Sequence, residues 1–262
     1  MNRVFIIPLG VIFLFTAGVL SALFFRLSPG EIISALASEE TRFALRLSLI
    51  TSVFSISLAL LLGVPTGYLL ARTNFPGKAI LDTFLDLPLV ITPLIAGVGL
   101  LFLFGRNMLG GVLGEWDIHI LFTPLGAVLA QSFVACPIVM RSSRAAFERV
   151  GHRYEWAAAT MGFRPYQIFF RISLPLAKQG ILAGAVLGWT RAIGEFGATL
   201  MVAGAIRFKT ETLPIAVYLN ISSGEMSTAL SCAWVLMTTG FLLLLALRWI
   251  GHVPSPEISP LW

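Results

Sequence analysis

The chain has 262 residues, of which 57% are hydrophobic and 12% are charged. Soluble domains carry roughly 25% charged residues, so this composition excludes an ordinary soluble protein and predicts an integral membrane protein. The formal net charge of +5 comes without long runs of Lys or Arg. We therefore expect no nucleic-acid partner, and we attribute the positive charge to cytoplasmic loops of a membrane protein.

Six apolar stretches are long enough to cross the roughly 30 Å of bilayer hydrocarbon, which takes about 20 helical residues. They cover residues 4–25, 46–71, 80–104, 121–141, 180–204 and 229–250. The first stretch has the position of a signal peptide, but its apolar run is too long for one, and we expect an uncleaved span. Most Lys and Arg residues between the spans fall on the side that holds both termini, which predicts that both termini are cytoplasmic.

The predicted fold class is thus an all-α polytopic membrane protein with six transmembrane helices, forming one domain over residues 1–262. An N-terminal span at 4–25 precedes a core at about 42–250, a large cytoplasmic loop occupies 142–179, and residues 251–262 form a C-terminal tail. Cys136 and Cys232 lie in apolar segments with no CxxC or Cys/His cluster, so we expect small buried residues and no metal site.

Two segments on the outer side also carry helix signals. Ser28, Pro29 and Glu31 have the order of an N-cap, a first helical residue and a capping-box acid. They predict a short interfacial helix that ends near Glu40. Residues 212–222 are apolar but too short to span a membrane, so they predict a helix or a re-entrant piece packed on the outer face.

Prolines interrupt two of the expected spans. Pro88 and Pro93 lie in the third, and Pro137 lies in the fourth. The backbone groups that proline frees must be satisfied by protein or by a water-filled cavity. Ordinary kinks and the lining of a pathway are both consistent with this pattern. Asp82 and Asp86 begin the third span, where acidic residues suit the helix dipole.

The large cytoplasmic loop predicts two short helices. An Ala-rich helix runs from about Arg153 to Gly162, a natural residue just beyond a helix end. Pro165 suits the first turn of a second helix, which we expect to stop before Pro175. Aromatic residues give these helices an apolar surface that would cover a partner protein or lie flat on the bilayer. The aromatic residues include Trp156, Phe163, Tyr166, Phe169 and Phe170.

The same loop resembles the "EAA" motif in permease subunits of bacterial and archaeal ABC importers. The matching positions are Glu155, Ala157, Ala158, Gly162, Ile172, Leu174 and Pro175. Trp156 is inserted after the glutamate, an offset associated with the molybdate and sulfate branch of that family. The segments LDLPLVITPLIAGVGLL (85–101) and GILAGAVLGWTRAIGEFGATLMVAG (180–204) extend the resemblance to the molybdate/tungstate type.

This resemblance implies a type I ABC importer-like permease in the cytoplasmic (inner) membrane. In such a family two copies of the subunit form a homodimer, and the EAA helix of each copy fits a groove on a cytoplasmic ATPase. An extracytoplasmic binding protein delivers the oxyanion. ATP and Mg would then bind the partner ATPase, and this chain would hold no cofactor. The sulfate/thiosulfate permeases are the nearest alternative, because these oxyanions share charge and shape.

Two opposite charges lie inside the fifth span. At about 100° per residue, one narrow face of a continuous helix would carry Gly180, Gly184, Gly188, Arg191, Glu195 and Ala198. Small residues at this spacing allow another backbone to approach closely. A charge facing lipid costs about 3 kcal/mol or more, so this face is expected at a dimer seam or along a pathway.

The roles of the two charges stay open at this point. Arg191 and Glu195 could form an i,i+4 ion pair that holds the span in register. Alternatively they line an anion path whose gate is formed by Gly194, Gly197, Ala198 and Thr199, where a helix break would free N–H groups for an oxyanion.

Other functional classes fit the sequence less well. It has no phosphate-binding loop of the GxxxxGK[ST] kind, and we find no nucleophile–base pair, so we expect a transport subunit and no catalytic residues. A self-sufficient secondary transporter would need buried acids for a coupling ion, and Glu195 is the only acid well inside an expected span.

Overall fold

The computed structural model describes residues 3–24, 26, 30 and 37–251. Every regular element in those residues is a helix. In chain order the elements are α1 (Arg3–Phe24), α3 (Glu39–Arg72), α4 (Lys78–Val90), α5 (Pro93–Leu103), α6 (Leu109–Gly114), α7 (Pro124–Arg149), α8 (His152–Thr160), α9 (Pro165–Ile168), the π-helical turn η1 (Phe169–Ser173), α10 (Leu174–Ile193), α11 (Gly197–Ala203), α12 (Leu213–Ser222) and α13 (Met226–Gly251). The all-α prediction is confirmed.

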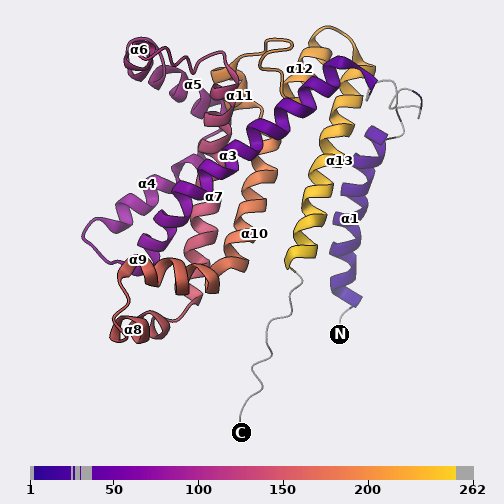
Figure 1. Cartoon of the computed structure of the whole chain (residues 1–262). Helices are drawn as coiled ribbons and strands as arrows, with labels where there is room; N and C mark the ends of the chain where they lie inside the picture. Colours follow the sequence, from indigo (N-terminus) through magenta and orange to yellow (C-terminus); the bar gives the residue numbers. More distant parts are fainter. Residues whose placement is uncertain (1–2, 25, 27–29, 31–36, 252–262) are drawn as a thin grey trace.

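The core of the molecule lies where α3, α7 and α10 pack together (Figure 1). Small residues such as Ala59 and Ala135 bring these helices close, and Val139, Phe147 and Ile181 fill the space between them. A second buried cluster joins α3 to α12 and α13 near the outer ends. A third joins α5, α7 and α11. The scaffold therefore links the outer short helices to the long helices that cross the membrane.

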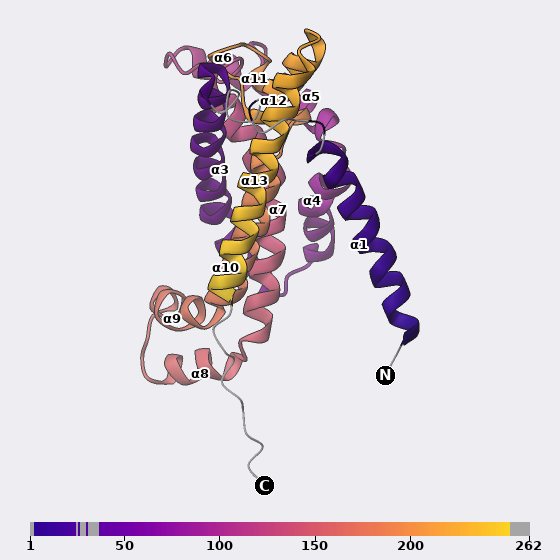
Figure 2. The same ribbon diagram turned by 90° about the vertical axis from the view of Figure 1, so that its right-hand side faces the viewer.

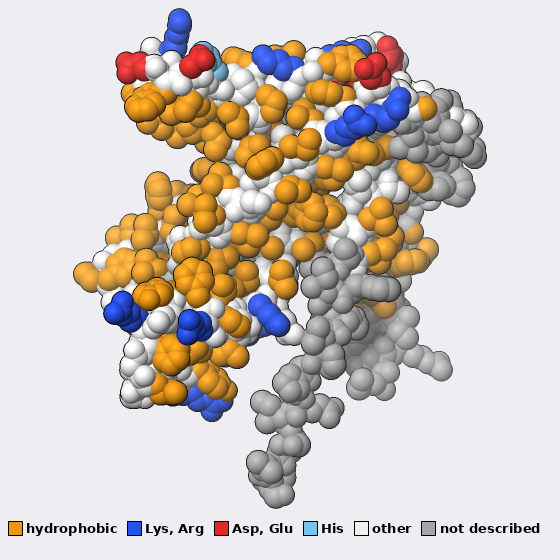
Figure 3. All heavy atoms as spheres, in the orientation of Figure 1, with side chains coloured by type: hydrophobic (Ala, Val, Ile, Leu, Met, Phe, Trp, Pro, Cys, Tyr) orange, Lys and Arg blue, Asp and Glu red, His pale blue; other side chains and the backbone are white. Residues whose placement is uncertain are grey.

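Four helices are long and apolar enough to cross a membrane, and the bent pair α4–α5 would add a fifth. Helix α1 has 22 residues, although the apolar stretch described in full, Ile7–Ala22, is too short to count alone. Figure 3 shows hydrophobic side chains over the middle of one face and charged side chains toward its two ends. The start of α1 and the end of α13 lie at the same end as α8 (Figures 1 and 2), as the charge distribution predicts.

Two of the expected spans are not continuous helices. The third, predicted over 80–104, is divided into α4 and α5, and the chain direction bends by 112° between them. Pro93 is at the start of α5 and cannot donate a backbone hydrogen bond, so the helix is interrupted at Ile91 and Thr92. The fifth, predicted over 180–204, ends at Ile193, and α11 begins a separate helix at Gly197.

The outer segments differ from expectation at one point. Ser28, Pro29 and Glu31 lie outside the described residues, as does the tail from residue 252. Helix α3 begins at Glu39, seven residues before the predicted span, because Ser38 accepts a hydrogen bond from the N–H of Thr41 and caps it. The predicted helix at 212–222 is present as α12, and most of its first half is buried.

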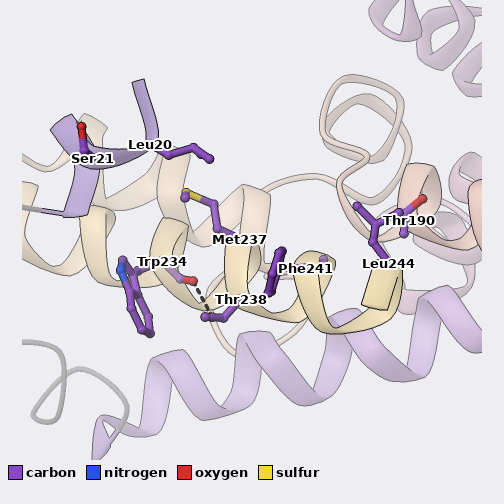
Figure 4. Close-up of a pocket in the computed structure, with 9 residues that line it drawn as sticks. Leu20, Ser21, Thr190, Trp234, Met237, Thr238, Phe241 and Leu244 are labelled. Carbon is purple, nitrogen blue, oxygen red and sulfur yellow. Dashed lines mark hydrogen bonds between the residues drawn. The ribbon is translucent and has the colours of Figure 1, made fainter. Parts of the chain in front are cut away.

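Helix α1 packs loosely against the rest of the protein, and an apolar groove of about 670 Å³ separates it from α13. Leu20 of α1 lies near Met237 of α13 at one end of this groove, and Thr190 of α10 lies beside Leu244 of α13 at the other (Figure 4). An apolar lining at membrane depth favours hydrocarbon over water.

Candidate functional site

The first candidate site is residues 152–175, which we call the coupling segment. It contains α8 and α9 and projects at the end of the molecule where α1 begins (Figure 2). Helix α8 ends in a Schellman motif: the N–H groups of Gly162 and Phe163 donate to the carbonyls of Ala159 and Ala158, respectively. Gly162 has φ +84°, in the left-handed region that favours glycine. The predicted glycine turn is therefore present at the predicted residue.

The second predicted helix does not stop before Pro175, and that expectation is wrong. Helix α9 continues through the π-helical turn into α10, so that helical structure runs from Pro165 to Ile193. Pro175 is at the start of α10, where its missing N–H is tolerated. In the π turn the N–H of Leu174 donates to the carbonyl of Phe169. The coupling segment and the fifth span are thus one connected element.

Glu155 lies in a network at the base of α8 instead of pointing into solvent. Its Oε1 accepts hydrogen bonds from Arg72 Nε (2.9 Å) and Ser173 Oγ (2.5 Å). The side chains of Arg72 and Glu155 are only 7% and 11% exposed. Arg72 also donates to the carbonyl of Val150 (2.8 Å). The glutamate therefore fastens α8 to the end of α3 and to the π turn.

The rest of the coupling segment presents an apolar outer surface. Of the five aromatic residues named from the sequence, Trp156, Tyr166 and Phe170 are exposed, with Trp156 at 68%. Phe163 is half-buried, and Phe169 packs edge-on against Tyr68 of α3. Ala157, Gly162 and Pro175 are exposed, Ala158 is buried, and Ile172 and Leu174 are half-buried. One face of α8 therefore packs against the rest of the protein, and the other face is exposed.

The second candidate site is the gate segment, residues 191–199. Arg191 Nη1 lies 2.5 Å from Glu195 Oε2, so the two charges form an ion pair. The other oxygen of Glu195 accepts the N–H of Ala198 (3.0 Å) in the first turn of α11. The Glu195 side chain is 1% exposed and that of Arg191 is 39% exposed. Glu195 thus joins the end of α10 to the start of α11.

The start of α11 lies against the elbow between α4 and α5. A Cβ on Gly197 would come within 3.1 Å of the Leu94 nitrogen, and one on Gly97 within 2.8 Å of the Ala198 Cα. Gly194 is exposed at the break, and Thr199 is buried. Its Oγ1 has no hydrogen-bond partner among the described residues. Only glycine permits this close contact between the two broken spans.

The three glycines of the small-residue face lie against α7 of the same chain. A Cβ on Gly180, Gly184 or Gly188 would come within 3.0 Å of Ala146, Ser142 or Val139, respectively. This part of the face is therefore not a dimer seam. Because the helix breaks after Ile193, Ala198 belongs to another helix and does not continue the face.

Several partners of the site escape sequence reasoning. Arg72 and Ser173 hold Glu155, although Arg72 is 83 positions away from it in the chain. The sequence predicts that Asp82 and Asp86 begin a span, but they lie beyond the first turn of α4. There they pair with Arg144 and Arg141 of α7. The sequence offers one signal for these contacts. Asp82 and Asp86 are spaced to lie on one helix face, and so are Arg141 and Arg144. The described residues contain no cluster of three or more His, Cys, Asp or Glu side chains that could bind a metal.

Comparison with known proteins places this architecture in a family. Residues 63–252 match the family described as binding-protein-dependent transport system inner membrane component. The molybdenum transport system permease protein ModB of Haemophilus influenzae is 39% identical over 79% of this chain and 92% of its own. The sulfate transport system permease protein CysW of Synechocystis is 38% identical over 78% of this chain and 74% of its own.

The fold is shared with a solved transporter as well. A chain in the crystal structure of a bacterial alginate ABC transporter, in complex with an alginate-bound periplasmic protein, superposes with a TM-score of 0.72. The match covers 94% of this chain and 91% of that one at 15% identity, so it supports the fold alone. With a family match over most of its length, the chain belongs to the binding-protein-dependent transport system inner membrane components.

Proposed function

We propose that this chain is the permease subunit of an ATP-driven ABC importer of tetrahedral oxyanions, with molybdate or tungstate as the substrate. It acts as a homodimer, receives the anion from an extracytoplasmic binding protein and is driven by a separate cytoplasmic ATPase that binds ATP and Mg. The observation that carries this proposal is the coupling segment, which joins an exposed apolar helix to the gate segment through one connected element.

The coupling role rests on how α8 is held. A partner that moves α8 can move the scaffold only if the two are rigidly joined. The buried Arg72–Glu155 pair and the Ser173 hydrogen bond supply that joint. The exposed Trp156 and Met161 offer apolar contact area to an ATPase groove. In this role Glu155 positions α8, and the exposed face of α8 makes the contacts.

The pathway role rests on the gate segment. An oxyanion that must be released needs hydrogen-bond donors more than a bare cation. Pairing with Glu195 neutralises much of the charge of Arg191, while part of its guanidinium stays exposed. In the proposed homodimer, a second copy would supply the opposite wall of the pathway.

Sulfate is the second candidate substrate. The CysW relative, named for sulfate transport, is as similar to this chain as the ModB relative, named for molybdenum transport. Sulfate and molybdate are both tetrahedral oxyanions. Discrimination between these anions would then reside in the binding protein.

Uptake into proteoliposomes tests the proposal directly. The chain would be reconstituted with its cognate ATPase and binding protein, and accumulated molybdenum, tungsten and sulfur would be measured by mass spectrometry. We expect ATP-dependent accumulation of molybdate or tungstate in preference to sulfate. Preferential accumulation of sulfate would show that sulfate is the substrate instead of molybdate or tungstate. Failure to assemble with any ATPase would overturn the proposal that the chain belongs to an importer.

A further inference from the structure

A small basic pocket lies on the outer part of α3, and its lining includes no residue of the two candidate sites. It has a volume of about 310 Å³ and is lined by Glu39, Arg42, Phe43 and Arg46 of α3 and by Phe208 of the loop after α11. Phe43 and Phe208 close one side, with ring centroids 5.7 Å apart in an edge-on contact. Basic side chains are visible over this part of α3, above a hydrophobic surface (Figure 3).

Two exposed arginines give the pocket its positive charge. Arg42 and Arg46 are exposed and lie one helical turn apart, so their like charges repel. Neither forms an ion pair within the described part of the chain. Arg42 donates from Nη2 to the carbonyl of Ala37 (2.6 Å) and from Nε to that of Ser38, which orients its guanidinium. An external anion would relieve the repulsion.

The depth of the pocket suits a membrane lipid. Helix α3 has 34 residues, about 51 Å at 1.5 Å per residue, whereas a bilayer measures about 40–45 Å with its headgroups. Its far end is fixed at the coupling segment by Arg72. Helix α3 runs obliquely (Figure 1), but it carries no charged residue between Arg46 and Arg72, so this apolar stretch crosses the hydrocarbon and the charged first two turns lie at the outer headgroup layer.

The surface below the pocket is apolar and continuous. Ile50 lies one turn below Arg46 on the same face of α3, and Phe54 lies one turn further. Both side chains are more than half exposed. A headgroup held by the arginines would place its acyl chains along these residues. A free anion could use the arginines, but it would not use the apolar stripe.

The geometry points to a binding site for an outer-leaflet phospholipid with an amino headgroup, such as phosphatidylethanolamine. Its negative phosphate lies between the positive Arg42 and Arg46, and its positive ammonium group lies at the negative Glu39. Each charge of the lipid thus meets an opposite charge of the pocket. Guanidinium groups bind phosphate oxygens by paired charge-assisted hydrogen bonds. The acyl chains follow Ile50 and Phe54.

The site also has a structural consequence. Phe208 belongs to the loop that follows α11, and its φ of +56° is unusual for a residue with a side chain. A lipid seated between Arg46 and Phe208 would hold this loop against α3. The pocket thus lies at the joint between a long span and the helix that ends the gate segment.

Retention of lipid by the purified protein tests the proposal. The full chain, purified in detergent, would be mixed with equal amounts of phosphatidylethanolamine and phosphatidylglycerol, and bound lipids would be counted by native mass spectrometry. We expect the double variant Arg42→Gln, Arg46→Gln to retain at least about tenfold less phosphatidylethanolamine, since two charge-assisted contacts are lost. Arg106→Gln removes an exposed outer arginine that does not line the pocket, and this control should retain lipid normally.

Two further arms separate the alternatives. Glu39→Gln should keep a bound lipid but shift the preference toward phosphatidylglycerol, because the partner of the ammonium group is gone. Excess inorganic phosphate should not displace the lipid. Equal retention by the wild type and the double variant would overturn the site, as would phosphate binding that depends on the arginines without any retained lipid. The altered residues are exposed, and thermal unfolding of each variant would verify that it folds.

Discussion

Glu195 carries a charge that has lost nearly all contact with solvent. Its carboxylate is satisfied by Arg191 on one side and by the N–H of Ala198 on the other. A buried carboxylate is tolerated only while such partners remain. At the scale of single residues, the ion pair and the break in the helix are therefore one device, because the same side chain serves both.

A double-mutant cycle tests this arrangement. Arg191→Ala should lower the free energy of unfolding by about 2–3 kcal/mol, less than the 3–5 kcal/mol typical of fully buried pairs, because Arg191 is 39% exposed. Glu195→Gln keeps an acceptor for Ala198 and should cost less. The double variant should be more stable than the sum of the two effects predicts. Strict additivity in thermal unfolding would show that the pair is not coupled.

Glu211 provides a prediction about pH. Burial raises the pKa of its carboxyl to about 7, with the neighbouring Glu40 adding to the effect and the N–H of Phe208 and Arg207 opposing it. The folded protein therefore holds a proton that the unfolded chain, with a pKa near 4.3, has released. Stability must fall as pH rises from about 4.5 to 7 and then level off, by up to roughly 3 kcal/mol.

Replacement of that carboxyl should remove the effect. In Glu211→Gln the amide cannot ionise and still accepts the N–H of Phe208, so its melting temperature should vary less between pH 5 and pH 8 than that of the wild type. The variant should be the more stable protein above pH 7. An unchanged pH profile would show that Glu211 is not the group responsible.

At the scale of elements, glycines set the distance between α10 and α7. A Cβ on Gly184 would lie 2.3 Å from the Cβ of Ser142, so Gly184→Ala must push the helices apart. We expect a loss of about 1–3 kcal/mol. Gly99 lies in α5 with nothing within 4 Å of its would-be Cβ, and Gly99→Ala should be neutral or slightly stabilising. Equal melting temperatures for the two variants would contradict this packing.

The elements differ in how well the sequence predicts them. The end of α8 at Gly162 and the start of α9 at Pro165 depend on glycine and proline within one turn, and both predictions are confirmed. The sequence predicts both stretches as spans without an end at Val90 or Ile193, because hydropathy is high on both sides of each, and it offers a break near Gly194 only as one alternative for the gate. Contact between α11 and the α4–α5 elbow accompanies both breaks, and the hydrogen bonds of Glu195 hold the second one as well.

Tertiary contacts are the part of the candidate site that sequence could not provide. A resemblance in the coupling segment singled out Glu155, but nothing local indicates that its partner is Arg72, at the end of another span. The same holds for Asp82 and Asp86, whose partners lie on α7. Spacing along one helix predicts pairs such as Arg191–Glu195, whereas pairs between helices depend on how the spans pack.

At the scale of the whole molecule, α10 connects the two candidate sites. It begins at Leu174, after the π turn, and ends at Ile193, so one helix of 20 residues joins the coupling segment to the gate segment. A partner that binds α8 differently in two states would shift the equilibrium between two positions of this helix. The membrane part of the protein would then respond as a unit.

The most direct test is the ATP hydrolysis rate of the reconstituted complex, measured with the binding protein loaded with molybdate and with it empty. The account predicts stimulation by the loaded form, a large loss of that stimulation in Trp156→Ala, and normal stimulation in Trp116→Ala. Trp116 is equally exposed but lies in the loop after α6. Full stimulation of Trp156→Ala would contradict the coupling role of α8, and hydrolysis that ignores the loaded binding protein would contradict the importer.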